Sequence, residues 1–420
     1  MSHDTLSLIS IPLVTGLIGY VTNWTGVLML FYPVEFRGIQ TRSLARIARH
    51  LPRRVREIPG IMVGGIGWQG IIPSRAAKMG SLAVDSGIAK LGTPEEFFAQ
   101  IDPGELAEQM LTGMTPQVRE ITDRMMREAY PRLWGELPAG ARELVHARVQ
   151  AQLPDLVDEL IARIAANIDQ LVDIKLMVIR RFNPELANRV FLDMGDRELR
   201  FIKNFGGAFG FLLGIPVAVL MRFAGAWWLL PLIGVAIGYT TNWLALWMIY
   251  APADPVQIGP WRIQGLFIRR QAEVAEVYAR IVADEIVTVA TFAGELLYGP
   301  RSDRTRVLIE TTMRPAIDRA AGPLGPGLRA AIGADEFDAL ITTLATEPVA
   351  SMIVPLVDPT FSRAQSAATR KLIVERMKLM SPRDFAEMLH TATREDEWLL
   401  LLHGAVLGFV GGLIHLAIFR

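Results

Sequence analysis

Four stretches of this chain are apolar and long enough to be membrane spans. Two of them, Ser7–Phe31 and Gly225–Tyr250, contain no Asp, Glu, Lys, Arg or His. Each exceeds the roughly 20 residues that an α-helix needs to cross the hydrocarbon core of a bilayer. The other two are less uniform, because one contains Pro216 and the other contains His403 and His415. We predict transmembrane helices at residues 7–31, 205–221, 225–250 and 399–419.

The composition predicts soluble segments between these spans. Of the 420 residues, 51% are apolar and 20% are charged, and the mean hydropathy is +0.30. This mixture is typical of membrane spans joined to soluble helical lobes. The 43 basic and 43 acidic residues cancel, so no overall field favours nucleic acid as a partner. The absence of Cys excludes disulfides and cysteine-ligated zinc.

The distribution of basic residues predicts the orientation. Near the span ends, within about 20 residues, we count 13 Lys and Arg residues on the side of the two long loops and only Arg222 and Arg420 on the other side. Because basic residues are retained in the cytoplasm, we expect both long loops to be cytoplasmic and both termini to be outside. We therefore predict a multi-pass membrane protein with cytoplasmic lobes.

The first and third predicted spans share a sequence. Gly19 to Pro33 is GYVTNWTGVLMLFYP and Gly238 to Pro252 is GYTTNWLALWMIYAP, an offset of 219 residues. The match predicts an internal duplication in which each copy is a span, a helical lobe and a second span. Because each copy holds an even number of spans, both enter the membrane in the same direction. We therefore expect parallel repeats, related by a pseudo-twofold axis along the membrane normal.

Two further matches support the duplication. GGAFGFLLG from Gly206 resembles GAVLGFVGG from Gly404 at an offset of 198, and QGIIPSR from Gln69 resembles QGLFIRR from Gln264 at an offset of 195. The smaller offset after the first span means that the first copy carries an insertion, at residues 40–66. This insertion is basic, and we expect its arginines to lie on an anionic membrane surface: Arg42, Arg46, Arg49, Arg53, Arg54 and Arg56.

The loops between the spans have helical patterns. Pro follows a capping residue at five places, which predicts that helices begin there: Thr93–Pro94, Asp102–Pro103, Thr115–Pro116, Asn183–Pro184 and Ser381–Pro382. Apolar residues recur at spacings of three and four from Leu153 to Leu171, as on one face of a helix. One stretch, Val256 to Gln264, resembles a small hairpin about Gly259. We expect helical lobe 1 at residues 32–204 and helical lobe 2 at residues 251–398.

These observations define the predicted fold class. It is a mainly α, polytopic membrane protein with four transmembrane helices in two parallel repeats and two cytoplasmic helical lobes.

The duplicated spans contain buried polar residues, which we treat as the candidate site: Thr22, Asn23, Thr241 and Asn242. A polar amide in hydrocarbon needs a hydrogen-bond partner, and a bond between helices there contributes on the order of 0.6 to 2 kcal/mol. We expect each Asn to find its partner across the repeat axis. The contact either joins the two pseudo-symmetric helices or lines a path for lipid headgroups or substrate. No Asp, Glu, Lys or Arg lies within a span, which argues against ion-coupled transport.

Glycine recurs every four residues in the second and fourth spans. A row with this spacing falls along one helix face and lets a neighbouring helix approach closely. We expect these positions to be helix-packing sites, with a thin wall beside a pore as the alternative: Gly206, Gly210, Gly214, Gly404, Gly408 and Gly412.

Motifs for common enzyme chemistry are missing from the sequence. Gly65 to Gly70 fits G-x-G-x-x-G, but the preceding residues make a poor strand and the first acidic residue afterwards is Asp85. His403 and His415 are twelve residues apart, which is not a metal-ligand spacing. We therefore expect no cofactor, no metal and no enzyme activity, with dispersed lobe carboxylates as the least favoured alternative.

Together these motifs resemble the bacterial membrane-protein family catalogued as domain of unknown function 445. The family's first-helix signature is similar to Thr241–Ala245 and, more loosely, to Thr22–Gly26. Its basic turn resembles Gln69–Arg75, and its closing signature resembles Arg197–Ile202 followed by Gly206. The resemblance frames both copies but covers no part of the lobes.

The second copy departs from the family pattern. REDEW at Arg394 replaces the Arg-Glu-Leu run, and Ser74 stands where the pattern has Lys. The resemblance implies the span, lobe and span layout, a location in the bacterial inner (plasma) membrane, and no settled activity.

Two functional hypotheses remain from the sequence. In the first, the chain is a membrane-anchored binding or structural protein of the cell envelope, whose lobes engage membrane lipid, a protein partner or a second copy. In the second, it transports lipid or a small amphiphile through a polar path at the repeat interface.

Overall fold

The computed structural model is mostly helical. It describes residues 3–43, 46, 50, 58–59, 65–129, 131–224, 226–321, 354–391 and 393–419. The chain divides into two compact units. Unit 1 comprises residues 1–87, 179–278 and 374–420, and unit 2 comprises residues 88–178 and 279–373.

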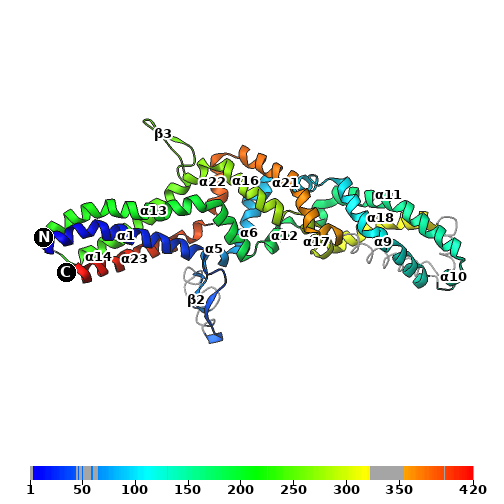
Figure 1. Cartoon of the computed structure of the whole chain (residues 1–420), viewed down its shortest axis with the longest axis horizontal. Coiled ribbons are helices and arrows are strands. Elements are labelled where there is room, and N and C mark those ends of the chain that lie inside the picture. The colour runs from blue at the N-terminus through cyan, green and yellow to red at the C-terminus, as the bar shows by residue number, and fades with distance from the viewer. Residues whose placement is uncertain are drawn as a thin grey trace. The chain divides into compact units, whose positions relative to one another are not determined.

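Four long apolar helices lie side by side in unit 1 (Figure 1). Helix α1 packs along α13, and α14 packs along α23. All four are long and apolar enough to cross a membrane, as the sequence predicts. Their bounds are α1 (His3–Phe31), α13 (Pro184–Ala224), α14 (Leu229–Tyr250) and α23 (Glu397–Phe419).

The ends of these helices differ from the predicted spans. The second span is the last part of the 41-residue helix α13, which extends it by some twenty residues at its N-terminal end. Helix α13 begins there because Pro184 occupies its first position and Asn183 caps it, accepting a hydrogen bond from the backbone of Leu186 at 2.8 Å. The third span begins at Leu229, because Trp227 and Trp228 form a turn.

The same succession of short elements follows α1 and α14. After α1 come strands β1 (Arg37–Gln40) and β2 (Gly65–Trp68), paired antiparallel, then α5 (Ile71–Ser74) and α6 (Ala76–Leu82). After α14 come the paired strands β3 (Val256–Ile258) and β4 (Trp261–Ile263), then α15 (Leu266–Arg269) and α16 (Gln271–Ile281). The described chain also contains the following helices: η1 (Ala83–Ile88), α7 (Ala89–Leu91), α12 (Ile174–Arg181), η2 (Val282–Ile286), α21 (Pro359–Leu379), α22 (Pro382–Thr391) and η5 (Arg394–Asp396).

The structure confirms the predicted hairpin and adds a second one. Gly259, in the two-residue loop between β3 and β4, has a φ of 60°, which favours glycine. The hairpin of β1 and β2 is not predicted by the sequence, because residues 41–64, most of the basic insertion, separate its strands. Arg42 and Arg46 are exposed. The other predicted surface arginines, Arg49, Arg53, Arg54 and Arg56, lie outside the described residues.

Unit 2 combines segments from both predicted lobes. Its long helix α11 buries every residue of the apolar row from Leu153 to Leu171. Helix α18 packs against α11, and Arg301 donates to the carbonyl oxygens of Asp169 and Val172, both at 2.8 Å. The described helices of this unit include α8 (Pro94–Phe98), α9 (Pro103–Ala129), α10 (Pro131–Glu136), α11 (Ala139–Leu171), α17 (Val289–Tyr298), α18 (Ser302–Ala321) and the 3-10 helix η4 (Val354–Val357).

Four of the five predicted helix starts are correct, since helices begin at Pro94, Pro103, Pro184 and Pro382, and the one at Thr115–Pro116 is wrong. Thr93 and Glu96 form a capping box at the beginning of α8. Thr115 caps nothing, since α9 continues through Pro116 and the Thr115 hydroxyl donates to the Leu111 carbonyl at 2.6 Å. The apolar face of α9 continues past the proline, with buried residues every four positions, and its packing maintains the helix: Leu106, Met110, Met114 and Val118.

Candidate functional site: the polar centre and charged end of the four-helix bundle

Glycine rows bring the two helices of each pair into close contact. A methyl group added at Gly206 on α13 would lie 2.5 Å from the Gly19 carbonyl oxygen on α1. A methyl group added at Gly404 on α23 would lie 2.5 Å from the Gly238 carbonyl oxygen on α14. Such distances leave no room for a side chain, so these helices touch backbone to backbone.

The other predicted packing glycines also face a partner helix. A methyl group at Gly210 would lie 2.6 Å from the Thr15 carbonyl oxygen on α1, and one at Gly214 would meet Thr15 and Pro12. A methyl group at Gly412 would lie 2.6 Å from the Cα atom of Pro231 on α14, and one at Gly408 would meet Gly234. The six glycines therefore lie at helix contacts within each pair.

Each asparagine of the duplicated stretch uses the gap that a glycine leaves. The amide nitrogen of Asn23 donates to the carbonyl oxygen of Ile202 on α13 at 2.7 Å. That of Asn242 donates to the carbonyl oxygen of Leu400 on α23 at 2.6 Å. In both cases the accepting residue precedes the first glycine of the row by four positions, so the amide passes over that glycine to reach the carbonyl.

The predicted partner across the repeat axis is therefore wrong. Both asparagines bond within their own helix pair, α1 with α13 and α14 with α23. The physical reason is reach: the Asn side chain is short, and the glycine row on the adjacent helix leaves a backbone carbonyl within hydrogen-bond distance.

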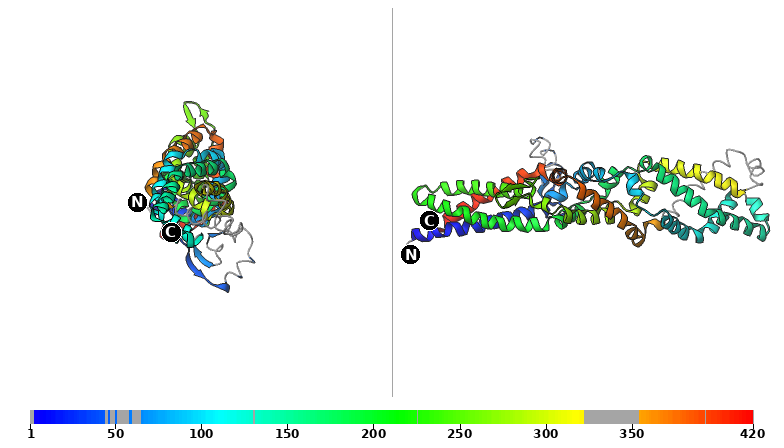
Figure 2. Two further views of the ribbon diagram at one scale, coloured as in Figure 1. Left: turned by 90° about the vertical axis from the view of Figure 1, so that its right-hand side faces the viewer. Right: turned by 90° about the horizontal axis from the view of Figure 1, so that it is seen from above.

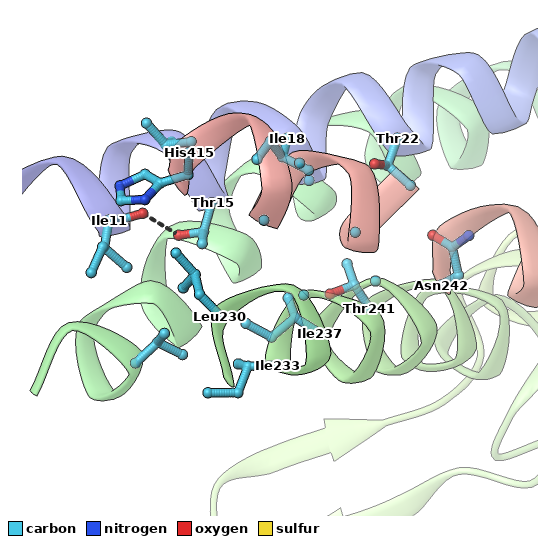
Figure 3. A pocket seen from close by; sticks show the side chains of 18 of the residues that line it. Ile11, Thr15, Ile18, Thr22, Leu230, Ile233, Ile237, Thr241, Asn242 and His415 are labelled. Atoms are coloured by element: carbon cyan, nitrogen blue, oxygen red, sulfur yellow. Dashed lines mark hydrogen bonds between the residues drawn. The ribbon is translucent and has the colours of Figure 1, made fainter. Parts of the chain in front are cut away.

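The four predicted polar residues line one cavity inside the bundle (Figure 3). Thr22 on α1 and Thr241 on α14 lie along it, with Asn242 towards one end and His415 towards the other. All four predicted residues are buried, with exposed fractions between 2% and 7%. Among the described residues, the Thr241 hydroxyl and the Asn23 side-chain oxygen have no hydrogen-bond partner.

The size of this cavity limits what it can hold. Its volume is about 40 Å³, and two further cavities lie along the bundle, of about 30 Å³ beside Asn23 and Asn242 and about 70 Å³ beside Glu198 and Asp396. A cavity that accepts benzene has about 150 Å³, and one water needs roughly 10 to 15 Å³. The bundle as it stands accommodates water molecules next to the unpartnered polar atoms, and no lipid chain.

The histidines of α23 make polar contacts with α1 of the other pair. His415 lies 3.1 Å from the hydroxyl of Ser10, and His403 lies 3.4 Å from the hydroxyl of Thr25, both on α1. The spacing of these histidines in the sequence argues against a metal site and does not predict these contacts. Their position inside an otherwise apolar span was the signal for a functional contact, because ionisable residues in a span are rare.

Two buried ion pairs lie at the end of the bundle where α1 and α14 terminate. Arg270, after α15, donates to both carboxylate oxygens of Glu198 on α13, at 2.8 and 2.6 Å. Arg75, after α5, donates to Asp396, just before α23, at 2.8 Å. The acids are 4% and 6% exposed. We call these four residues the charged layer.

The charged layer connects the two helix pairs reciprocally. Arg270 and Arg75 differ by the offset of 195, and Asp396 and Glu198 differ by the offset of 198, so the residues correspond in the predicted duplication. The arginine that follows α14 binds the acid of α13, and the arginine that follows α1 binds the acid next to α23. Sequence alignment of the copies contains this correspondence but does not say which acid each arginine meets.

Exposed charges extend one of the two pairs. Glu273 accepts a hydrogen bond from Arg270 at 2.9 Å and another from Arg197 at 3.2 Å. The hydrogen bond with Glu273 raises the pKa of the Arg270 guanidinium; burial opposes this rise, and Glu198 adds to it. The same hydrogen bond lowers the pKa of Glu273. Both groups are therefore charged at neutral pH.

The remaining predicted features have structural roles. Gly65 and Gly67 lie in β2, and a methyl group at Gly70 would lie 2.6 Å from the Phe31 carbonyl carbon, so the G-x-G-x-x-G stretch forms a hairpin and a close turn. The four-residue helix α5 that follows is not a dinucleotide site. Within the described ranges, no group of three or more His, Asp or Glu is placed to hold a metal ion.

Comparisons with protein-family models, with curated proteins and with solved structures found no match to this chain.

Proposed function

We propose that this chain is a multi-pass protein of the bacterial inner membrane that acts as a membrane-anchored binding or structural protein of the cell envelope. It engages membrane lipid or a protein partner through surfaces held by the bundle. The observation that carries the proposal is the four-helix bundle itself, with two pairs closed by glycine and asparagine and joined by a buried charged layer.

The exterior of the bundle supports a lipid environment. Large apolar side chains are exposed on each of the four helices, whereas a water-soluble bundle would bury most such side chains. They include Leu13, Leu17, Leu212, Val219, Leu232, Leu402 and Val406, which are 50% to 63% exposed.

Two parallel repeats account for the recurring contacts. The asparagine bonds, the closest glycine approaches and the buried ion pairs each occur twice, at residues related by the sequence offsets. A gene duplication with a pseudo-twofold axis explains all three recurrences at once. The family that this chain resembles, domain of unknown function 445, has the same span, lobe and span layout. We propose that the chain is a member of this family, on the motifs of its duplicated spans.

The excess of basic residues near the long-loop ends of the spans supports cytoplasmic lobes. Because the chain has no Cys, single cysteines can test this. We expect Ser2→Cys to react with an impermeant thiol reagent from outside intact cells and Ser302→Cys to react only after lysis. Labelling of both from the same side contradicts the orientation.

The second candidate is transport of a lipid or small amphiphile along the bundle. The row of three cavities with Asn23 and Asn242 between the first two favours it. Their volumes require the helix pairs to separate before anything larger than water passes. Binding is the better supported role for the closed bundle.

Mass spectrometry of the protein purified in a mild detergent or in lipid discs tests the proposal. We expect phospholipid or a defined protein to co-purify in fixed stoichiometry. A vesicle assay that shows movement of a fluorescent phospholipid, dependent on Asn23 and Asn242, would instead favour transport.

A further inference from the structure

The hairpin of β3 and β4 has one apolar face. Val256 pairs with Ile263, and Ile258 pairs with Trp261, so these four side chains project to the same side. Gln257 and Arg262, the third pair, project to the other side. The apolar residues are 46%, 36%, 59% and 72% exposed, in the order named, so the described chain leaves this face uncovered.

The hairpin of β1 and β2 repeats this feature. Ile39 pairs with Ile66, and Arg37 pairs with Trp68 two residues along, on the same face. Ile39 and Ile66 are 69% and 68% exposed. The β3–β4 hairpin thus carries three β-branched residues and a tryptophan on one side, and the β1–β2 hairpin carries two isoleucines, a tryptophan and Arg37.

Matching contacts hold the base of each hairpin at the end of a membrane helix. Gly70 donates to the Pro33 carbonyl at 2.9 Å, and Gly265 donates to the Pro252 carbonyl at 3.0 Å. Gln69 and Gln264 also donate across their hairpin bases. From there the two hairpins project sideways beyond the helices of the bundle (Figures 1 and 2).

An exposed two-stranded hairpin is marginally stable in water, and an apolar face needs a covering surface. The hairpins follow α1 and α14, whose exposed apolar side chains would be covered by membrane lipid. The same lipid is therefore the nearest surface that could cover the hairpins. Since the hairpins leave the bundle sideways, they extend along the plane of a membrane that the bundle crosses. Tryptophan and arginine are residues that favour the membrane–water interface.

We propose that both hairpins insert their apolar faces into the lipid interface at the end of the spans, as lateral anchors of the bundle. This inference rests on the proposed membrane function. The face of Val256, Ile258, Trp261 and Ile263 lies among acyl chains and headgroups, and the face of Gln257 and Arg262 lies in water. The face of Ile39, Ile66 and Trp68 is buried in the same way, with the guanidinium of Arg37, on the same face, among the headgroups.

Lipid-dependent fluorescence quenching of full-length protein tests the proposal. Single cysteines replace Ile258 or Ile66 on the apolar faces, Gln257 on the opposite face and Val406 on the outside of α23. Each is labelled with an environment-sensitive fluorophore and reconstituted in phosphatidylcholine–phosphatidylglycerol vesicles. The vesicles carry a nitroxide either at the headgroup or in the middle of the acyl chain.

We expect labels at Ile258→Cys and Ile66→Cys to emit at shorter wavelength and to be quenched by the headgroup nitroxide, and Gln257→Cys to show neither effect. Equal quenching at Ile258→Cys and Gln257→Cys overturns the hairpin proposal, provided that the acyl-chain nitroxide quenches Val406→Cys. Absence of quenching at Val406→Cys overturns the proposed membrane function itself. A blue shift at Ile258→Cys that disappears when the protein is diluted into more lipid identifies a second copy as the occupant and also overturns the proposal.

Discussion

The asparagines of the apolar bundle and the arginines of the charged layer at its end bond in opposite ways. In the bundle, Asn23 and Asn242 bond within their own helix pair. In the charged layer, Arg75 and Arg270 each bond an acid of the other pair. The difference follows from side-chain length and from solvent. A short amide in hydrocarbon reaches only the nearest carbonyl, whereas a long guanidinium at the edge of the bundle spans the gap between pairs and keeps some contact with water.

The comparison indicates separate tasks for the two regions. Amide and glycine contacts close each pair, and the ion pairs fix how the two pairs meet. Four substitutions or conditions test this division.

The largest effect is expected from breaking one buried ion pair. Arg270→Met leaves the buried Glu198 carboxylate uncompensated, which costs about 3 kcal/mol of unfolding free energy. Unfolding by a denaturing detergent in mixed micelles, followed by circular dichroism, measures the loss. The matched control is Arg197→Met, which removes a 62% exposed partner of Glu273 and costs less than about 1 kcal/mol. Equal losses for the two variants would contradict the importance of the buried pair.

The next effect is expected at the glycine contacts. Gly206→Ala places a methyl group 2.5 Å from the Gly19 carbonyl oxygen and should destabilise the bundle by about 1 to 3 kcal/mol. Gly207→Ala, one residue away, meets Tyr20 at 3.4 Å, an ordinary contact, and should change stability by less than about 0.5 kcal/mol. The same unfolding assay compares them, and similar stabilities would show that α1 and α13 are not in backbone contact.

A smaller effect is expected from the asparagines. Asn23→Leu and Asn242→Leu each remove one bond between helices, at about 0.6 to 2 kcal/mol. Because each bond lies within its own pair, the double variant should lose the sum of the two, to within about 0.5 kcal/mol. A double-mutant cycle with a larger coupling energy would indicate that the two amides act on each other across the repeat axis.

The smallest effect is expected from pH at the edge of the charged layer. Hydrogen bonding by Arg270 lowers the folded-state pKa of Glu273 from its usual 4.5. Its contribution to stability is therefore complete above pH 4.5 and decreases as the pH falls through the lowered pKa. From pH 6 to pH 3, the free energy of unfolding should decrease slightly less for Glu273→Gln than for the parent chain. An unchanged pH profile would show that the ion pair is not formed in solution.

Much of the bundle could be predicted from the sequence. The four spans follow from length without charge, and the contact rows follow from glycine spacing within one helix, such as Gly206, Gly210 and Gly214. The hairpin about Gly259 follows from a local turn signal. These features depend on residues within a few positions of one another, and the chain determines such features locally.

The partners of the polar residues could not be predicted in the same way. The carbonyl that Asn23 binds is 179 residues away, and Arg75 and Asp396 are 321 residues apart. The strands of the first hairpin are separated by the basic insertion, which hides their pairing. No local pattern distinguishes among several carbonyls or acids at the same depth.

The sequence by itself determined that the chain has four apolar helices, two of them with glycine faces, and polar residues at corresponding places in two of them. Only the tertiary structure decided that the amides close each pair and that the arginines join the pairs. Helix formation is a property of neighbouring residues, whereas the choice of a hydrogen-bond partner depends on which distant backbone or side chain the packing brings within about 3 Å.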